Sequence, residues 1–169
     1  MQLVILTGAS GSGKTAIAEA IASERPPLAK VLHFDRIGVP PLEERSALWG
    51  TEEAWQRAMT FGWMGRISRM AELSRPVLFE GQMRLAFLED GMSSVGIMGA
   101  RIILVDCDDA TRVHRLITER HQPDLANPKM MNWAAYLRRE AQEANCEVLD
   151  TTGVSLQSSV AQVRRYLEE

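Results

Sequence analysis

Eight consecutive residues near the start of the chain have the spacing of a loop that binds phosphate groups. They are Gly8-Ala9-Ser10-Gly11-Ser12-Gly13-Lys14-Thr15. The three glycines permit backbone angles that aim successive N–H groups at one point, and the N-terminus of a following helix adds partial positive charge. Lys14 is expected to reach the β and γ phosphates of a nucleoside triphosphate, and the Thr15 hydroxyl to coordinate Mg²⁺. The loop therefore predicts a site for a nucleotide and a metal ion.

A carboxylate and several guanidinium groups further along the chain could act on such a nucleotide. Asp35 comes directly after the apolar residues 31–34, where it can orient an acceptor hydroxyl and take its proton during phosphoryl transfer. A strand-end cap or turn residue is the alternative interpretation. Arg112, Arg115 and Arg120 lie on or near one face of an expected helix and can stabilise charge on a transferring phosphoryl group. Arg120, nearest the following loop, is the first candidate and Arg115 the second, solvated arginines being the alternative.

Five short apolar runs are expected to form the strands that position these residues. The runs cover residues 3–6, 31–34, 77–79, 102–105 and 148–149. Continuous apolar character indicates strands covered by helices on both faces, and hence a parallel sheet. Helical patterns lie between the runs, at 15–25, parts of 43–73, 109–120, 131–145 and 155–167. The alternation predicts a single three-layer α/β/α domain over residues 1–169 with a five-stranded parallel sheet and right-handed crossovers.

Two intervals are longer than a plain crossover requires. Residues 36–75 hold Trp49, Trp55 and Trp63, which could pack a helical hairpin onto the sheet, bind an acceptor, or do both. Residues 120–131 contain two prolines between helical patterns, which predicts an exposed loop. We interpret the first interval as an acceptor-binding insertion and the second as a short lid.

Composition limits the possible partners of the chain. Its 19 basic and 22 acidic residues give a formal net charge of -3, so no overall positive field exists to recruit nucleic acid or an anionic membrane. Cys107 and Cys146 are isolated thiols, and the three histidines form no zinc pattern with them. The sequence shows no apolar leader and no stretch long enough to span a membrane. We therefore expect a cytoplasmic protein whose partner is a small molecule, with its oligomeric state open.

Two other classes of nucleotide-binding protein can be tested against the sequence. Asp35-Arg36-Ile37-Gly38 matches the D-x-x-G of a GTPase switch, but it follows Gly8 too soon for the intervening elements, and no Asn-Lys-x-Asp guanine motif occurs downstream. A motor or AAA-type ATPase needs sensor and coupling elements for which 169 residues leave no room. A short phosphoryl-transfer enzyme remains.

In the order of these elements the sequence resembles the nucleoside monophosphate kinase-like group of small P-loop kinases over essentially its full length. Shikimate kinase, gluconate kinase and chloramphenicol phosphotransferase carry an Asp facing the acceptor hydroxyl where this chain has Asp35. The segment Phe79-Glu80-Gly81-Gln82-Met83-Arg84 is similar to the Asp-Gly-Phe-Pro-Arg segment of adenylate kinases. The resemblance implies ATP as donor and Mg²⁺ as metal.

The resemblance also implies roles for individual residues. Glu80 would hold a Mg²⁺-bound water, and Arg84 would reach the acceptor or its phosphate, with Arg36 as a second cation on the acceptor side. Thr152 and Gly153, in the segment that cups adenine in these kinases, would contact the base. Gln82 and Met83 replace the Phe-Pro pair that shapes a nucleotide acceptor pocket, which favours a hydroxyl acceptor.

We therefore predict a kinase that transfers the γ-phosphoryl group of ATP to a hydroxyl of a small molecule, a metabolite or an antibiotic. The predicted catalytic residues are Lys14, Asp35, Arg115 and Arg120. A nucleoside or nucleotide kinase is the nearest alternative. A regulatory or toxin-like P-loop module with weak ATPase activity is the more distant one.

Overall fold

The computed structural model of the chain describes residues 2–70 and 74–169, in which five parallel strands form one sheet. The strands are β1 (Leu3–Thr7), β2 (Lys30–His33), β3 (Val77–Gly81), β4 (Arg101–Asp106) and β5 (Glu147–Asp150). Their order across the sheet is β2-β3-β1-β4-β5. Each strand overlaps one of the apolar runs, and the parallel pairing confirms the predicted sheet.

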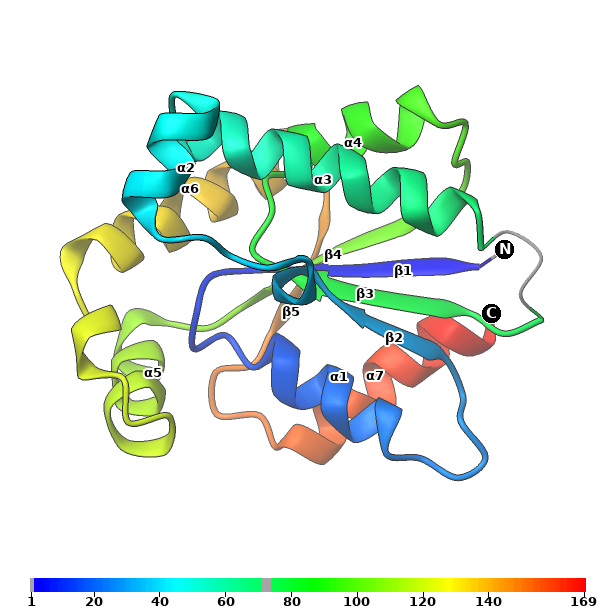
Figure 1. Cartoon of the computed structure of the whole chain (residues 1–169). Coiled ribbons are helices and arrows are strands. Elements are labelled where there is room, and N and C mark those ends of the chain that lie inside the picture. The colour runs from blue at the N-terminus through cyan, green and yellow to red at the C-terminus, as the bar shows by residue number, and fades with distance from the viewer. Residues whose placement is uncertain (1, 71–73) are drawn as a thin grey trace.

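Helices cover both faces of this sheet (Figure 1). They are α1 (Lys14–Ala22), α2 (Leu42–Trp49), α3 (Glu52–Ser68), α4 (Leu85–Ser94), α5 (Asp109–His114), α6 (Pro128–Glu143) and α7 (Leu156–Glu168). A π-helical turn over Arg115–Glu119 continues α5, and short 3-10 turns cover Phe34–Ile37 and Pro123–Leu125. Residues 71–73, at the end of the region expected to be partly helical, lie outside the described residues.

The central strand β1 divides the core into two layers. Its side chains alternate, so that Val4 and Leu6 pack into a cluster with α1 and α7, whereas Leu3 and Ile5 pack with α3 on the opposite face. Figure 1 shows α1 and α7 below the sheet and α3, α4 and α6 above it. Burial of all five β1 residues explains why its sequence is apolar without alternation.

The insertion between β2 and β3 is helical, as expected. Trp55 and Trp63 of α3 are buried in the upper core, and Trp49 packs against the same cluster. Trp63 also donates a hydrogen bond from Nε1 to the carbonyl of Phe34 over 3.0 Å. The packing role of these tryptophans is confirmed, and their contact with an acceptor stays a prediction.

Helix α4 corresponds to none of the helical patterns expected from the sequence. Its N-cap position, Arg84, makes no capping hydrogen bond. Instead Glu140 of α6 accepts hydrogen bonds from the backbone N–H groups of Leu85, at 2.8 Å, and Ala86, at 3.5 Å. Because this cap comes from a residue distant in the sequence, the local pattern carries no start signal for the helix.

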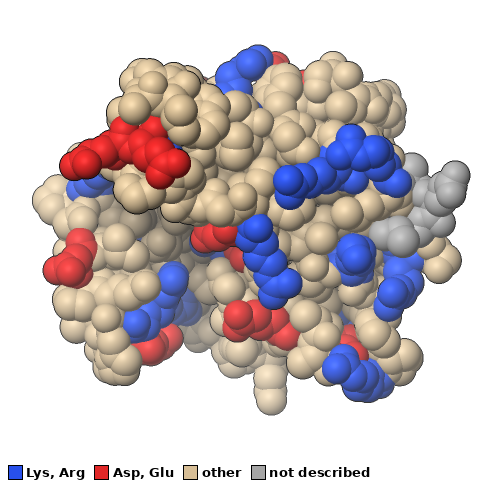
Figure 2. All heavy atoms as spheres, in the orientation of Figure 1, with Lys and Arg blue, Asp and Glu red and all other residues tan. Residues whose placement is uncertain are grey.

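Charged side chains occupy the drawn face in small groups of either sign, with acidic residues gathered over α2 at the upper left of Figure 2. The first turn of α2, which begins at Leu42, contains Glu43 and Glu44. Among the described residues, none of the helices is both long and apolar enough to cross a membrane.

Candidate functional site

The predicted phosphate-binding loop connects β1 to α1, which begins at Lys14. Gly13 takes the N-cap position with φ 99°, a left-handed conformation that glycine adopts without steric penalty. At Gly8 a Cβ would lie 2.2 Å from the carbonyl oxygen of Val105, so the loop passes directly against β4. The strand, loop and helix thus have the arrangement that places backbone N–H groups and a helix N-terminus at one point.

Lys14 is a buried cation in this loop. The residue is 5% exposed and forms no ion pair with any residue that the structure describes. Burial lowers its pKa, Glu80 and Asp35 act to raise it, and Arg120 lowers it further. An anionic phosphate would supply the missing countercharge, so the site fits the nucleotide that the sequence implies.

A carboxylate beside the loop could provide oxygen ligands for a metal ion. Glu80, at the end of β3, accepts a hydrogen bond from Thr15 Oγ1 over 3.2 Å and is 5% exposed. Mg²⁺ bound to phosphates usually takes only one or two protein ligands besides water. Thr15 and Glu80 are the residues that could hold it, and their proximity fits that role.

His33 contacts the same carboxylate and was not recognised from the sequence. Its Nδ1 lies 2.7 Å from Glu80 Oε1. The contact follows from the register of the parallel strands, in which His33 of β2 pairs with Glu80 of β3. One signal in the sequence could have identified His33. It is a polar residue at the carboxyl end of a strand, and the neighbouring strand also ends in a polar residue.

The π-helical turn places Arg120 beside the loop. The backbone N–H of Arg120 donates to the carbonyl of Arg115 over 3.0 Å, an i→i+5 bond that stacks the two residues. In a regular α-helix the neighbours of Arg115 on the same face would instead be the residues three and four positions later in the sequence. Arg115, Glu119 and Arg120 consequently line one cavity of about 240 Å³ with Lys14 and other residues of the loop.

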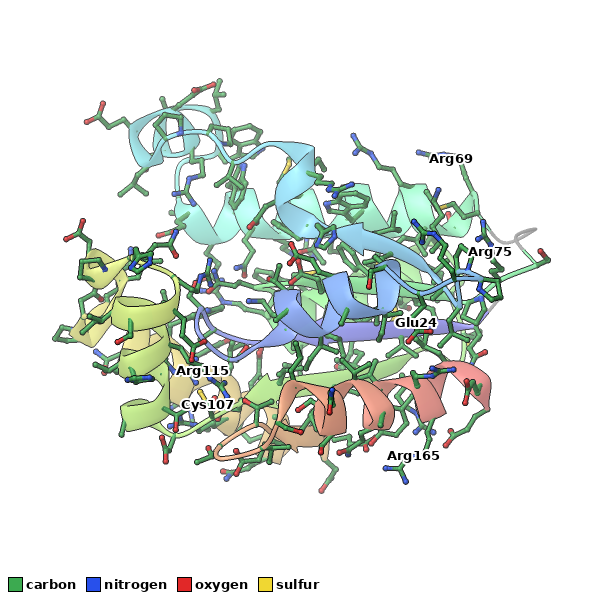
Figure 3. The ribbon with its side chains drawn as sticks, turned by 90° about the horizontal axis from the view of Figure 1, so that it is seen from below. Glu24, Arg69, Arg75, Cys107, Arg115 and Arg165 are labelled. Atoms are coloured by element: carbon green, nitrogen blue, oxygen red, sulfur yellow. The ribbon has the colours of Figure 1, made fainter. Side chains whose placement is uncertain are left out.

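Arg115 has contacts that extend beyond this cavity. Its Nη1 donates to Thr151 Oγ1 over 2.8 Å and its Nη2 to the Thr151 carbonyl over 2.9 Å. Nη1 also lies 3.3 Å from the carbonyl oxygens of Gly11 and Ser12. Arg115 and Cys107 lie near each other (Figure 3), and both contact the carbonyl of Gly11. Its contact with a phosphoryl group stays a prediction.

The segment after β5 was predicted to contact the base through Thr152 and Gly153. In the structure the preceding residue, Thr151, contacts the phosphate-binding loop. Thr151 Oγ1 donates to the carbonyl of Ser12 over 2.8 Å, which joins this segment to the loop. Thr152 Oγ1 instead accepts from the N–H of Asp108 over 2.8 Å, and Gly153 faces open space. The roles of Thr152 and Gly153 at the base stay predictions.

The residues predicted to face the acceptor lie in two places. Asp35 and Arg36 are exposed in the 3-10 turn that follows β2. The guanidinium of Arg84 donates to Gln56 Oε1 over 2.6 Å and lies 5.0 Å from the Trp133 ring and 5.4 Å from the Tyr136 ring. Arg84 thus lies between the insertion and α6, and its guanidinium is already occupied by the Gln56 side chain and the two aromatic rings.

The segment predicted to be a lid contacts the insertion. Asn127 caps α6 by accepting a hydrogen bond from the N–H of Met130 over 2.9 Å. Lys129, in the first turn of α6, pairs with Glu52 of α3 across 3.3 Å. This ion pair links residues 120–131 to residues 36–75, and movement of the segment stays a prediction.

The chain is similar in structure to several solved proteins, although its sequence has no match among family models or curated proteins. A sugar kinase from Janibacter sp. HTCC2649 matches at TM-score 0.68 and 17% identity, covering 99% of this chain and 95% of the other. Shikimate kinase from Acinetobacter baumannii, in complex with shikimate, matches at 0.64 and 13%, with coverages of 99% and 94%.

A gluconokinase from Sinorhizobium meliloti 1021 matches at TM-score 0.60 and 16% identity, covering 99% of this chain and 91% of the other. The coverage is almost complete in all three comparisons, and the identities are low. The similarity therefore concerns the arrangement of helices and strands. The chain has the fold of the small P-loop kinases.

Proposed function

We propose that the chain is an ATP- and Mg²⁺-dependent kinase that transfers the γ-phosphoryl group to a hydroxyl of a small molecule, a metabolite or an antibiotic. The observation that carries this proposal is the buried ammonium of Lys14, which forms no ion pair with a described residue and lies in a loop at a helix N-terminus. Such a group is stabilised by the phosphates of a nucleotide. The similarity of the fold to sugar, shikimate and gluconate kinases supports the same class.

The donor half of the reaction is assigned to residues around the loop. Lys14 would bind the β and γ phosphates, and Thr15 and Glu80, which are hydrogen-bonded to each other, would hold Mg²⁺, Glu80 through a water molecule. The metal ion, when bound, neutralises charge on the phosphates. Arg120 reaches the transferring group from the π-helical turn and stabilises the charge that spreads over its oxygens. Arg115 lines the same cavity and assists.

The acceptor half is assigned to Asp35, which orients the hydroxyl and accepts its proton. The charge of Asp35 acts on the pKa of Lys14, which supports its proximity to the donor site. Arg84 is already hydrogen-bonded to Gln56 and faces aromatic rings, so binding a second phosphate would require it to leave these contacts. These observations favour a hydroxyl over a phosphate as acceptor.

The partner is proposed to be a small molecule in the cytoplasm, with no nucleic acid or membrane involved. A deoxyadenosine kinase from M. mycoides is also similar, at TM-score 0.53 and 9% identity, so nucleosides belong among the acceptors to be tested.

The test is release of ADP from MgATP in the presence of a panel of sugars, polyols, hydroxy acids, aminoglycosides and nucleosides. We expect one chemical class to stimulate ADP release, and Lys14→Ala to abolish the stimulation. Asp35→Asn should lower kcat by about 100-fold or more with the KM for ATP unchanged, because it removes the proton acceptor. Asp90→Asn, at an exposed position of α4, is the matched control and should retain activity.

Two results would contradict the proposal. An unchanged kcat in Asp35→Asn would remove the base assignment and favour a phosphate acceptor. Tight ATP binding without transfer to any member of the panel would favour the regulatory module.

A further inference from the structure

Three consecutive carbonyl groups of the phosphate-binding loop accept hydrogen bonds from two arginines that follow β4. Arg112 Nη1 donates to the carbonyl of Ser10 over 2.8 Å. Arg115 Nη1 lies 3.3 Å from the carbonyl oxygens of both Gly11 and Ser12. The outer side of the loop is therefore held by guanidinium groups along its middle.

Arg112 is completely buried, which separates it from the arginines that line the cavity. Its exposed fraction is 0%, and it is absent from the residues that line the cavity with Lys14. A Cβ at Gly11 would lie 3.1 Å from Arg112 Cγ, so the side chain packs directly behind the loop. This position excludes Arg112 from direct contact with a phosphoryl group in the cavity.

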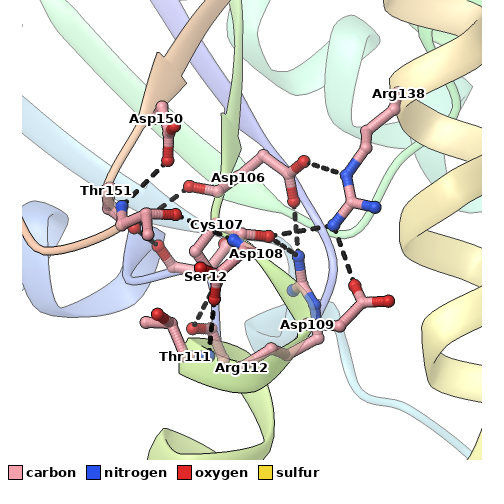
Figure 4. Close-up of polar contacts among 12 residues, drawn as sticks. Ser12, Asp106, Cys107, Asp108, Asp109, Thr111, Arg112, Arg138, Asp150 and Thr151 are labelled. Carbon is pink, nitrogen blue, oxygen red and sulfur yellow. Dashed lines mark hydrogen bonds and ion pairs between the residues drawn. The ribbon is translucent and has the colours of Figure 1, made fainter.

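The charge of Arg112 is balanced by Asp106 at the end of β4. Arg112 Nη2 donates to Asp106 and, over 3.2 Å, to the carbonyl of Cys107 (Figure 4). Breaking a buried ion pair by removing one partner is strongly destabilising, whereas replacing the whole pair by apolar groups is often neutral. Stability alone therefore does not account for a buried pair at this place.

Asp106 also connects the loop to α6. Arg138 of α6 donates through Nε to the same carboxylate, and its Nη2 contacts the carbonyl of Cys107 at 2.9 Å and Asp109 at 3.0 Å. The hydrogen bond that Arg138 donates to Asp106 raises the pKa of this guanidinium above its ordinary value. In Figure 4 Arg138 reaches Asp106 from the right and Arg112 reaches it from below.

Peptide geometry gives these contacts a consequence for the loop. A peptide unit is planar and trans, so its carbonyl and the following N–H point in opposite directions. Fixing the carbonyl of Ser10 on the outer side directs the N–H of Gly11 inward, and fixing the carbonyl of Ser12 does the same for the N–H of Gly13. The N–H between them, that of Ser12, donates within the loop to the carbonyl of Ala9 over 3.3 Å. Donors fixed in this manner need no reorganisation when an anion binds.

We propose that Arg112 is a positioning residue that, held by Asp106, orients the backbone N–H groups of the loop toward the phosphates of the nucleotide. The inference rests on the proposed function, since it takes the bound anion to be a polyphosphate. It predicts that Arg112 determines nucleotide affinity without touching the nucleotide.

The experiment measures the Kd of a fluorescent ATP derivative with Mg²⁺, and of inorganic tripolyphosphate, for Arg112→Met and Arg112→Lys. Measurements are made at a temperature at which circular dichroism shows the variant and the wild type fully folded. We expect Kd for both probes to rise about tenfold or more in Arg112→Met. The Kd of Arg112→Lys should lie between those of the wild type and Arg112→Met, because one ammonium can replace only some of the hydrogen bonds of the guanidinium. Arg164→Met, an exposed arginine of α7, is the control and should bind like the wild type.

A purely structural role would lower the melting temperature and leave Kd of the folded protein unchanged, and that result would overturn the inference. Should Arg112→Met fail to fold, Arg112→Lys and Asp106→Asn decide, since both keep a polar group in place and both should raise Kd. A wild-type protein that binds neither probe would instead overturn the proposed function and the inference with it. If the wild type binds both probes and every Arg112 and Asp106 variant binds them equally well, the inference is overturned but the proposed function is not.

Discussion

Thr15 Oγ1 donates a hydrogen bond to Glu80 Oε2 over 3.2 Å, joining the first turn of α1 to the end of β3. The other carboxylate oxygen of Glu80 lies 2.7 Å from Nδ1 of His33, at the end of β2. One buried carboxylate thus connects the carboxyl ends of two neighbouring strands to the phosphate-binding loop. In open parallel sheets this edge is where ligands bind.

Replacing Lys14, the buried cation of the loop, should weaken the binding of MgATP without lowering the stability of the protein. We expect Lys14→Met to lose MgATP binding by about 100-fold or more, because the β and γ phosphates lose their cation. The melting temperature without nucleotide should stay equal or rise, because an unpaired charge is no longer buried. Thermal unfolding with and without MgATP measures both effects. A variant that is less stable and still binds MgATP would contradict the site assignment.

The cap of α4 by a distant residue predicts a stability effect at Glu140. Glu140→Gln keeps the side-chain shape and removes the negative charge at the helix N-terminus, so we expect the free energy of unfolding to fall by about 1 kcal/mol. Glu143→Gln, at an exposed position of the same helix, is the control and should change it little. Urea denaturation compares the two variants. Equal effects would show that the cap contributes nothing.

Gly81 of β3 and Gly62 of α3 should respond in opposite directions to replacement by alanine. A Cβ at Gly81 would lie 2.4 Å from Phe34 Cβ in the core, so Gly81→Ala should destabilise the fold by about 1–3 kcal/mol. Because Phe34 precedes Asp35, the same change should also reduce phosphoryl transfer. At Gly62, in the middle of α3, the nearest atom would be 3.9 Å away, and Gly62→Ala should stabilise by about 0.5–1 kcal/mol. Destabilisation by both changes would contradict the packing of these two positions.

Both thiols should react slowly with iodoacetamide near neutral pH. Burial raises the pKa of Cys107 and of Cys146 above the ordinary value of 9.0, so each is protonated at neutral pH and forms thiolate only as the pH rises. Cys107 is 3% exposed, whereas Cys146 is partly exposed, so Cys146 should be labelled first. Mass spectrometry over time gives the order, with the urea-unfolded chain as reference. Labelling of Cys107 at the unfolded rate would show that β4 and the loop are not packed as described.

The sheet and its strands could be predicted because their signals are local. Each strand carries an apolar run of its own, and the glycines, lysine and threonine of the loop are consecutive. The helical pattern expected at 155–167 corresponds to α7, whose N-cap Ser155 accepts a hydrogen bond from the N–H of Ser158. Helix α4 was not, because its cap comes from Glu140 on another helix.

The arginines show most clearly where the sequence stops being informative. Regular helical spacing put Arg112, Arg115 and Arg120 near one face, but in the structure only Arg115 and Arg120 line the cavity beside the loop. Arg112 is buried behind the loop, Arg115 spans the loop and Thr151, and Arg120 reaches the cavity through a π-helical turn. A one-residue change in helical register rotates a side chain to another face, and residue type does not encode that change.

The sequence by itself determined the phosphate-binding loop, the parallel sheet and the strand ends at which Asp35 and Glu80 lie. These depend on backbone angles and burial over a few neighbouring residues. Only the tertiary structure decided that His33 and Thr15 share the Glu80 carboxylate, that Asp106 joins Arg112 to Arg138, and that Arg84 faces the rings of α6. Such contacts are made between elements distant in the chain, and their partners are set by strand register and helix packing.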